Sequence, residues 1–478
     1  MTTTLTALLP MLWVTLASIV VLLQLSIRRN HLAAVVLTCI GLLGALAGII
    51  PAAMVVPHQV TSLLLVDAFA LFFSGATIAA GLVVALLARP YLEACDEHKE
   101  EFYVVLLLAV LGALVLVSST HFTSFFLGLE LLTVSLVIMI GYLRSSNQSV
   151  EAGLKYLILA TASSAFMLFG LALLYYEFGS MEFNAIGSVL RDGTVPDPAL
   201  VVIGSALLFV GVGYKLAVVP FHMWTPDVYE GAPAPVTAFV ATVPKGAMIA
   251  FLFRLFQEAG YNHMTPLVAA VSVLAVASMF IGNFLALRQD NIKRLLAYSS
   301  ISHMGYLLVA VVAGGTMAMG AVGYYVVAYY ITLLAAVGII SVLSGGQPEL
   351  MDLEDYRGLF WRRPGIAAVL AGAMLSLAGI PLTAGFIGKF LVLTAGVGSA
   401  LWALVILLVV NSAIGLYYYL RVTVILFSHR DTEDAIGGAS VTFAGGAVIA
   451  LLGFLMLFLG VYPTPLLWIL RLVGVTMQ

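Results

Sequence analysis

Long apolar runs, separated by short polar stretches, follow one another along almost the whole sequence. A helix needs about 20 consecutive apolar residues to cross the hydrocarbon core of a bilayer. Counted at that length, the pattern predicts an all-α polytopic membrane protein with about fourteen transmembrane helices. The predicted helices cover residues 7–27, 32–52, 67–88, 102–118, 121–143, 152–176, 199–219, 235–257, 266–287, 294–313, 317–343, 365–396, 400–426 and 441–462.

The stretch 211–250 departs from this pattern because prolines and charges interrupt its apolar residues. Lys215 and Lys245 each lie inside an apolar run. Proline cannot donate a backbone hydrogen bond and clashes with the preceding turn, so a break at membrane depth needs protein or water around it. We therefore predict a broken helix around Pro220 with a polar interior, as in transporter cores. The residues between the two lysines that support this are Pro220, His222, Pro226, Asp227, Glu230, Pro233 and Pro235.

A second interruption is similar to the first. The segment KLAVVPFHMW around Pro220 is echoed by SLAGIPLTAGF around Pro381, and each proline has a lysine nearby. Lys215 precedes the first break, and Lys389 follows the second. The first broken helix is predicted to run inward and the second outward. This opposite direction is what an inverted repeat requires.

The composition agrees with a membrane protein. Of the 478 residues, 62% are hydrophobic and only 9% are charged, and the mean hydropathy is +1.12. A soluble protein carries about 25% charged residues. Because no linker suggests a separate soluble domain, residues 1–478 are expected to form a single membrane domain.

Several kinds of binding site are not expected in this chain. The net charge of −3 gives no reason to expect a nucleic-acid partner. Cys39 and Cys95 form no CxxC pair, and no spacing is typical of an iron–sulfur, haem or zinc site. The sequence GVGYKL at 211–216 lacks the preceding strand and the later glycine of a dinucleotide site. We therefore expect no cofactor, metal or redox centre in this chain.

Lysine and arginine are distributed unevenly between the predicted loops. With the N-terminus outside, fourteen of the twenty lie on the cytoplasmic side, three lie outside, and Lys215, Lys245 and Lys389 lie within the membrane. Because cytoplasmic loops carry an excess of these residues, both termini are expected on the outer, periplasmic side. The cytoplasmic set is Arg28, Arg29, Arg89, Lys99, Arg144, Lys155, Arg288, Lys293, Arg294, Arg357, Arg362, Arg363, Arg421 and Arg430, and the outer set is Arg191, Arg254 and Arg471.

Glu130 and Lys215 are the first candidates for proton transfer. Glu130 lies roughly nine residues into its predicted helix, which is about 14 Å deep at a rise of 1.5 Å per residue. Ionisable groups at that depth are costly and usually mark an ion path. Lys215 is the expected partner, because a carboxylate stabilises a buried ammonium group. The alternatives are a structural ion pair for Glu130 and a side chain that reaches the membrane surface for Lys215.

Two further lysines and two histidines complete the candidate set. Lys245 is flanked by proline and glycine, which permit local distortion of the helix, and Lys389 follows the second break. For each lysine the alternative is a purely structural charge. His222 and His303 are candidate proton relays, since histidine exchanges protons near neutral pH, and their alternative is a structural hydrogen bond. The tyrosines at 417–419 are interpreted as packing residues.

Several segments resemble a known family. They are VPFHMWTPDVYEGAPAPV, NIKRLLAYSSISHMGYLL, SLAGIPLTAGFIGKF, NSAIGLYYYLR, DEHKEEFYVVLLLAVLG and SVEAGLKYLILATASSAF. Together they resemble the antiporter-like membrane subunits of bacterial proton-pumping NADH:quinone oxidoreductase (respiratory complex I), and among these subunit N most closely. The likeness covers nearly the whole chain. Relatives of that subunit are subunits L and M and the Mrp-type cation/proton antiporters.

The resemblance implies a more detailed architecture. It implies two inverted five-helix repeats, covering roughly 102–257 and 266–426, with helices 7 and 12 broken. The central polar axis of the family matches Glu130, Lys215, Lys245 and Lys389. Subunit M has glutamate where Lys389 stands, and the chain ends soon after its last predicted helix, without the long lateral helix of subunit L. The first feature favours subunit N or L, and the second then leaves subunit N.

The resemblance also implies a function. The chain would be a non-redox, proton-translocating subunit in the bacterial cytoplasmic (inner) membrane, with FMN, iron–sulfur clusters and quinone bound by partner subunits. It would contact subunits M and K of the membrane arm and membrane lipids. Two other functions stay open on the residues alone, namely a sodium/proton antiporter subunit and a non-transporting scaffold for assembly.

Overall fold

The computed structural model describes residues 2–95, 98–193, 197–345, 349–429 and 441–475. Arg430, which the sequence assigned to the cytoplasmic side, lies outside the described residues. Within the described part, twelve helices are long and apolar enough to cross a membrane. They are α2 (Leu9–Ile27), α3 (His31–Ala53), α4 (Ala68–Glu93), α6 (Phe122–Ile140), α7 (Asn147–Phe178), α9 (Pro198–Leu216), α11 (Ala234–Glu258), α12 (Thr265–Ala286), α13 (Ile292–Ala313), α14 (Gly315–Ser344), α18 (Trp402–Phe427) and α19 (Phe443–Val461).

Three shorter apolar helices fill the remaining predicted segments. They are α5 (Glu101–Val117) and the consecutive pair α16 (Pro364–Ala378) and α17 (Ala384–Gly398), which together occupy the segment predicted at 365–396. The prediction of an all-α polytopic membrane protein is therefore confirmed. Short helices complete the chain: α1 (Thr2–Ala7), α8 (Phe183–Asp192), α10 (Trp224–Gly231), η1 (Tyr261–His263), η2 (Leu353–Tyr356), α15 (Leu359–Arg362) and α20 (Thr464–Val475).

A small hairpin forms the one β-sheet among the described residues. Strands β1 (His58–Thr61) and β2 (Leu64–Val66) pair antiparallel between α3 and α4, with His58 opposite Val66. Leu64 also bridges to Ser119, so the hairpin is attached to the connection between α5 and α6. Strands of four and three residues are too short to stand out from the apolar runs around them, and the sequence did not predict them.

Polar residues between the apolar runs start several of the long helices. The side chains of Asn30, Asp67, Asp197 and Asn291 accept hydrogen bonds from backbone N–H groups in the first turns of α3, α4, α9 and α13. A helix begins with N–H groups that have no partner within the helix, and short polar side chains at this position satisfy them. The sequence thus fixes these helix starts locally.

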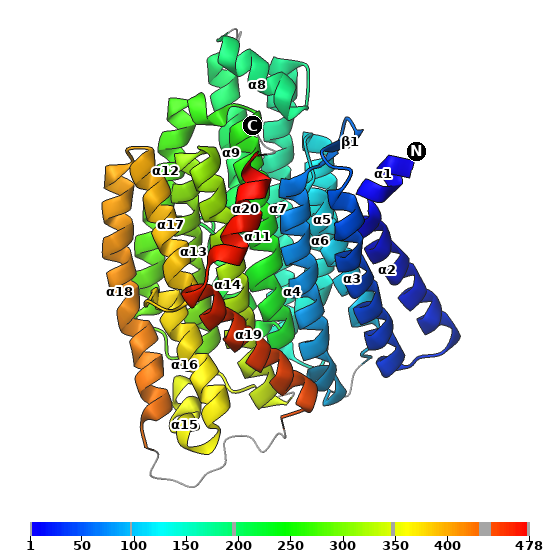
Figure 1. Ribbon diagram of the computed structural model, residues 1–478, viewed down its shortest axis with the longest axis vertical. Coiled ribbons are helices and arrows are strands. Elements are labelled where there is room, and N and C mark those ends of the chain that lie inside the picture. The colour runs from blue at the N-terminus through cyan, green and yellow to red at the C-terminus, as the bar shows by residue number, and fades with distance from the viewer. Residues whose placement is uncertain (1, 96–97, 194–196, 346–348, 430–440, 476–478) are drawn as a thin grey trace.

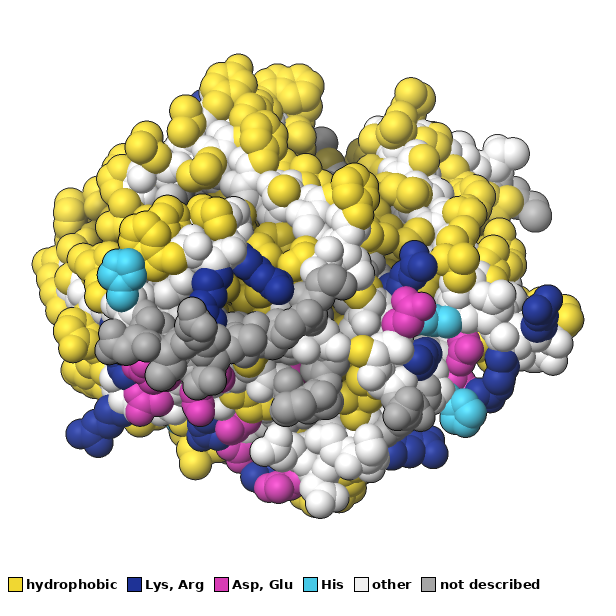
Figure 2. Space-filling view, turned by 90° about the horizontal axis from the view of Figure 1, so that it is seen from below, with side chains coloured by type: hydrophobic (Ala, Val, Ile, Leu, Met, Phe, Trp, Pro, Cys, Tyr) yellow, Lys and Arg dark blue, Asp and Glu magenta, His cyan; other side chains and the backbone are white. Residues whose placement is uncertain are grey.

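The long helices run side by side between two ends of the molecule (Figure 1). Both chain termini, the hairpin and α8 lie at the upper end, while α15 lies at the lower end. Helix α19 crosses obliquely over the front, where it contacts α14 and α4. Figure 2, seen from below, shows charged side chains of both signs gathered in a band on the lower face, beside extensive hydrophobic surface.

Helices α11, α13 and α14 form the buried centre. The most apolar window of α11 is 100% buried inside the protein, and those of α13 and α14 are each 94% buried, against 28% for α2. A helix surrounded by protein on all sides needs no one-sided apolar stripe. Since Lys245 lies on α11 and His303 on α13, these polar groups belong to the helices that are farthest from lipid.

Both predicted breaks are present. Helix α9 ends at Leu216, Ala217 adopts a left-handed conformation with φ of 60°, and α10 begins at Trp224. Helix α16 ends at Ala378, Gly379 has φ of 85°, and α17 begins at Ala384. In each predicted repeat, the broken helix is the fourth of five along the chain.

The second break is closed by a close approach of its two halves. A Cβ atom on Gly385, in the first turn of α17, would lie 1.9 Å from the carbonyl oxygen of Ser376 near the end of α16. The N–H of Gly385 donates to the Ser376 hydroxyl at 3.1 Å. Only glycine allows the backbones to come this near, so the geometry of the break depends on this residue.

Candidate functional site

Lys215 lies in the last turn of α9 and is 5% exposed. Its Nζ donates to the hydroxyl of Thr133 on α6 at 2.6 Å, and it lies 5.3 Å from the ring centre of Tyr156 and 5.5 Å from that of Tyr214. Aromatic faces and the carbonyl end of a helix both attract a cation. The first break therefore creates a place for a buried ammonium group.

Glu130 lies on α6, one helical turn before Thr133, and is half-buried. Its Oε1 accepts a hydrogen bond of 2.6 Å from Ser164 on α7. The carboxylate interacts electrostatically with Lys215, but among the described residues the side chain of Lys215 donates to Thr133 and that of Glu130 accepts from Ser164. The direct hydrogen-bond partner of Lys215 is Thr133, which was not predicted from the sequence as a site residue.

Lys245 lies in the middle of α11 and is 0% exposed. Its Nζ donates to the hydroxyl of Ser300 on α13, and the ring centre of Tyr229 lies 5.3 Å away. Ser300 also shares a 2.5 Å hydrogen bond with Tyr329 and accepts one of 3.3 Å from Tyr229. Hydroxyl groups can both donate and accept, so this cluster can pass a proton as well as stabilise a charge.

His303 lies on α13, about one helical turn beyond Ser300, and is 3% exposed. Its Nδ1 is 2.6 Å from the hydroxyl of Tyr325, and its Nε2 is 3.0 Å from that of Tyr419. Tyr419 is also hydrogen-bonded to Ser299, the neighbour of Ser300. A nearly continuous set of hydroxyl and imidazole groups thus leads from Lys245 to His303. Tyr419, interpreted as packing from the sequence, is part of it.

Lys389 lies on α17 and is 6% exposed. Its Nζ reaches back across the second break and donates to the carbonyl of Ala378 at 2.8 Å and to Ser412 on α18 at 2.9 Å. The ring centre of Tyr306 lies 5.2 Å away. Because Ala378 ends α16, this ammonium also sits at the carbonyl end of a half-helix, as Lys215 does.

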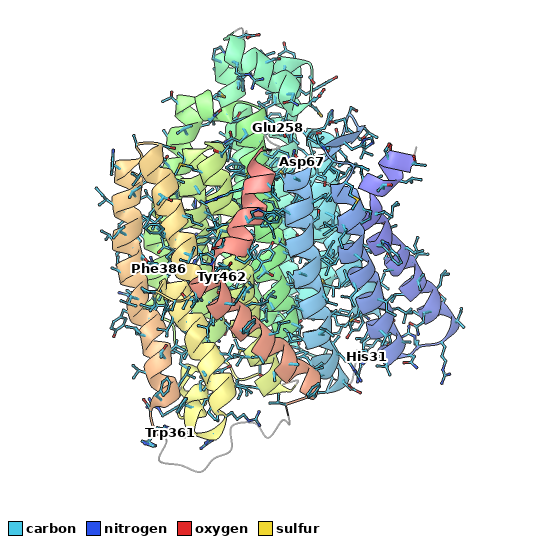
Figure 3. All side chains as sticks on the ribbon, viewed as in Figure 1. His31, Asp67, Glu258, Trp361, Phe386 and Tyr462 are labelled. Carbon is cyan, nitrogen blue, oxygen red and sulfur yellow. The ribbon has the colours of Figure 1, made fainter. Side chains whose placement is uncertain are left out.

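Two cavities lie beside the second break, whose position is marked by Phe386 in Figure 3. One, of about 10 Å³, lies between His303, Tyr329 and Ser376, and this is the room of about one water molecule. The other, of about 260 Å³, is lined by Lys389, Ser412 and Phe386. Polar groups thus approach the break from both sides.

His222 lies in the link between α9 and α10 and is 8% exposed. Its Nδ1 has no hydrogen-bond partner among the described residues. The structure brings His303, but not His222, into the hydrogen-bonded set around Lys245. His222 is held instead in the link whose geometry is fixed by the hydrogen bond from Trp224 Nε1 to the carbonyl of Tyr214, at 2.9 Å.

The lower mouth of the first break carries a network of charges. Asp227 on α10 accepts from Lys155 and from Arg294, each at 2.9 Å, and Glu230 accepts from Arg294 at 2.7 Å. Lys155 also pairs with Glu151 at 2.8 Å. A pocket of about 180 Å³ opens among these carboxylates, so water at the lower end has access to them.

Some polar groups of the interior can be recognised in the sequence, and others cannot. The serines of α13 recur along one stretch of the sequence, whereas Thr133, Ser164 and Ser412 are single small polar residues inside apolar helices. Such residues are common in transmembrane helices and carry no positional pattern. Among the described residues, no group of three or more His, Cys, Asp or Glu side chains is arranged to hold a metal ion.

The family model described as "NADH:quinone oxidoreductase/Mrp antiporter, TM" matches residues 119–415. The chain belongs to this family. The matched region is more than half of the 478 residues, and it includes both breaks and every candidate lysine. The chain is accordingly an antiporter-like, multi-pass membrane subunit of the complex I and Mrp type.

Solved structures support this assignment. A chain of respiratory complex I from Thermus thermophilus is 30% identical, with 96% of this chain and 98% of that chain covered and a TM-score of 0.82. The Mrp complex from Dietzia sp. DQ12-45-1b contains a chain that is 20% identical, with 99% and 97% covered and a TM-score of 0.88. A membrane-bound sulfane sulfur reductase, an archaeal respiratory membrane complex, contains one that is 22% identical, with 99% and 98% covered and a TM-score of 0.86. The same fold thus occurs in chains of several multi-subunit membrane complexes, and other subunits of such a complex are the partners of this chain.

Proposed function

We propose that this chain is the proton-translocating subunit N of the membrane arm of a bacterial NADH:quinone oxidoreductase. The observation that carries the proposal is the set of three buried lysines, Lys215, Lys245 and Lys389, on polar contacts in the interior of an antiporter-like fold. The 30% identity with a complex I chain, over almost the full length of both chains, supports that complex over the others. Buried lysine, unlike arginine, can take up and release a proton.

The arrangement of groups supports a route with an entrance at the lower end. A proton enters among Asp227 and Glu230 and is held near Glu130 and Lys215. It then passes to Lys245 and, through the hydroxyls of α13 and His303, to Lys389. His222, in the link of the first break, is a second candidate relay. Each lysine carries the proton while the next one is neutral, so charge moves without a metal or redox group in this chain.

The proposal places the chemistry of electron transfer in other subunits. FMN, iron–sulfur clusters and quinone belong to those partners, and this chain is the non-redox part of the translocase. Subunits M and K of the membrane arm are its proposed neighbours, together with membrane lipids, and no nucleic acid is involved. The lower end, where charged side chains gather, faces the cytoplasm of the bacterial inner membrane, and both termini face the periplasm.

Substitution of Lys245 by alanine tests the function. In the purified complex reconstituted into vesicles, Lys245→Ala is expected to retain NADH oxidation in part but to build a smaller proton gradient for each NADH oxidised. The matched control is Lys99→Ala, because the ammonium of Lys99 donates to the carbonyl of Glu93 at the surface. A gradient like that of the wild type would favour a scaffold role. A gradient that requires sodium would favour a sodium/proton antiporter subunit.

Thiol labelling tests the orientation. Cys39 and Cys95 are first replaced by alanine, and a single cysteine is introduced at exposed Asn147 or at Met54, which is 81% exposed. Asn147→Cys, at the lower end, is expected to react with a membrane-impermeant reagent only from the cytoplasm. Met54→Cys, near the hairpin, is expected to react only from outside. Labelling of both positions from the same side would contradict the proposed topology.

A further inference from the structure

A buried group of three charged side chains lies at the upper end of α11. Arg254 donates from Nη2 to Asp67 Oδ1 and from Nη1 to Glu258 Oε1, each at 2.8 Å. The exposed fractions of the three side chains are 1%, 5% and 16% respectively. Figure 3 shows Asp67 and Glu258 close together at the top of the bundle. The sequence placed Arg254 on the outer surface, but the structure buries it completely.

The charges of this cluster do not balance. A guanidinium group stays protonated in proteins, so Arg254 contributes one positive charge. Two ionised carboxylates beside it would leave one excess negative charge away from water, which is costly. Arg191 on α8 also brings a positive charge, but its side chain is exposed and contacts the backbone carbonyl of Glu258, at 3.4 Å, rather than the carboxylate, so water screens that charge and it does not correct the imbalance. Tyr261 on η1 accepts from Ser205 at 3.3 Å.

The surroundings decide which carboxyl group is neutral. Asp67 is the N-cap of α4, accepts from the N–H of Ala70 at 2.7 Å and lies at the positive end of that helix. Glu258 is the last residue of α11, where the helix presents its negative end. Glu258 Oε2 is buried and has no partner among the described residues, and the same holds for Arg254 Nε. Asp67 therefore suits an anion, and Glu258 suits a neutral acid.

We propose that Glu258 holds a proton in the resting protein and releases it to the upper side, as a second exit that branches from the route at Lys245 and bypasses Lys389. In this step the O–H bond of the Glu258 carboxyl group breaks, its electron pair stays on the oxygen, and the proton passes to water. The carboxylate that remains is stabilised by Arg254 until a new proton arrives. Glu258 is the most exposed member of the cluster, so exchange with water takes place there. The release role rests on the proposed function, whereas the neutral state of Glu258 does not.

The position of the cluster fits a release site. Glu258 and Lys245 lie on the same helix, 13 residues apart by their numbers, which is about 20 Å along the helix axis. The cluster is thus at the end of α11 opposite to the entrance at Asp227 and Glu230. Helix α8 covers it, with Gly187 packed against the carbonyl of Glu258. A proton that leaves Glu258 therefore emerges on the face that carries both termini.

Infrared spectroscopy of the purified complex at neutral pH tests the protonation. The wild-type spectrum is expected to contain a carbonyl band of a neutral carboxylic acid that is absent in Glu258→Gln, which keeps the shape and the hydrogen bond to Arg254. Glu177→Gln is the matched control, because Glu177 accepts from the N–H of Asp197 at the upper surface, and it should leave the band unchanged. Equal spectra for wild type and Glu258→Gln would overturn the proposal.

A second variant tests the charge count itself. Asp67→Asn removes one of the two carboxyl groups, so the remaining one can ionise beside Arg254, and the acid band is expected to disappear although Glu258 is present. Persistence of the band would overturn the argument from charge balance. For the release role, Glu258→Gln should lower the number of protons translocated per NADH. An unchanged number in Glu258→Gln, with a reduced one in Lys245→Ala, would exclude Glu258 from the path and leave the proposed function intact.

Discussion

Replacement of Glu349 by alanine is expected to lower the free energy of unfolding by about 3–5 kcal/mol. Glu349 and Lys293 form an ion pair of 2.7 Å in which both side chains are 0% exposed. Loss of the carboxylate leaves the ammonium of Lys293 buried without a counter-charge. It also removes the acceptor of the Ala234 N–H, at 2.7 Å, and of the Tyr91 hydroxyl, at 2.6 Å. The Lys293 ammonium would keep the carbonyls of Glu230 and Ala232 but lose its counter-charge, and the buried Ala234 N–H would lose its acceptor.

Thermal unfolding of the purified complex measures this effect. Glu349→Gln is the informative companion variant, because an amide oxygen can still accept from Ala234 and Tyr91 while the charge is lost. It should fall between the wild type and Glu349→Ala. Glu354→Ala is the matched surface control, since Glu354 is 66% exposed and pairs with Arg357, and such pairs contribute about 1 kcal/mol or less. Equal stability of Glu349→Ala and Glu354→Ala would contradict the buried-pair argument.

The two buried clusters, one around Glu349 and one around Arg254, attach the two ends of α11 to α4. At its lower end, Glu349 joins the first N–H of α11 to Tyr91 near the end of α4. At its upper end, Arg254 joins α11 to Asp67 at the start of α4. Both ends of the helix that carries Lys245 are therefore fixed to the same neighbour. Movement around Lys245 during transport must then occur within the middle of α11, beside Pro244 and Gly246, or in α4 and α11 together.

The helices themselves could be predicted closely from the sequence. The run 235–257 corresponds to α11 at Ala234–Glu258, and 266–287 corresponds to α12 at Thr265–Ala286. Such agreement follows because the thickness of the bilayer sets the length of an apolar run, and no tertiary contact is needed to recognise it. The breaks at Pro220 and Pro381 were predictable for a similar reason, since proline acts on its own helix.

Pairings between distant residues could not be predicted in this way. Arg254 and Asp67 are 187 positions apart, and Lys293 and Glu349 are 56 apart. A charge near the end of an apolar run has the same sequence pattern whether it faces water or a partner. Lys293 was therefore assigned to the cytoplasmic surface, although the structure buries it completely. Whether such a charge faces water or a buried partner is decided only by how α4, α11 and α13 pack against one another.

In the candidate site, too, some residues could be predicted from the sequence and others could not. The lysines stand out because a charge within an apolar run is rare, whereas their partners do not. Lys215 was paired with Glu130 because a carboxylate stabilises a buried ammonium group, and the structure adds a direct hydrogen bond to Thr133, which lies about one turn beyond Glu130 on α6. Which small polar residue of α6 contacts the ammonium depends on the rotation of that helix, and hydrophobic periodicity does not fix helix rotation to within a fraction of a turn.

Replacement of Lys389 by arginine is expected to slow proton transfer through the second break by about 10–100-fold, which corresponds to about 1.4–2.8 kcal/mol. Arginine keeps the positive charge but does not readily release a proton. The fold should tolerate the change, because the cavity of about 260 Å³ beside Lys389 gives room for a guanidinium group. The carbonyl of Ala378 and the hydroxyl of Ser412 remain as acceptors for its N–H groups. The charge at the end of α16 is thus retained, while its capacity to transfer a proton is removed.

Reconstituted complex that carries Lys389→Arg is scored for NADH oxidation and for the proton gradient that it builds. Electron transfer should continue in part, whereas the number of protons translocated per NADH should fall. Ser412→Ala is the matched control, because it removes one acceptor but leaves the lysine and its bond to Ala378, and it should have the milder effect. A wild-type ratio of protons to electrons in Lys389→Arg would show that the ammonium only completes the carbonyl end of α16. The proton would then pass the second break by another route, for which the hydroxyls around His303 are the nearest groups.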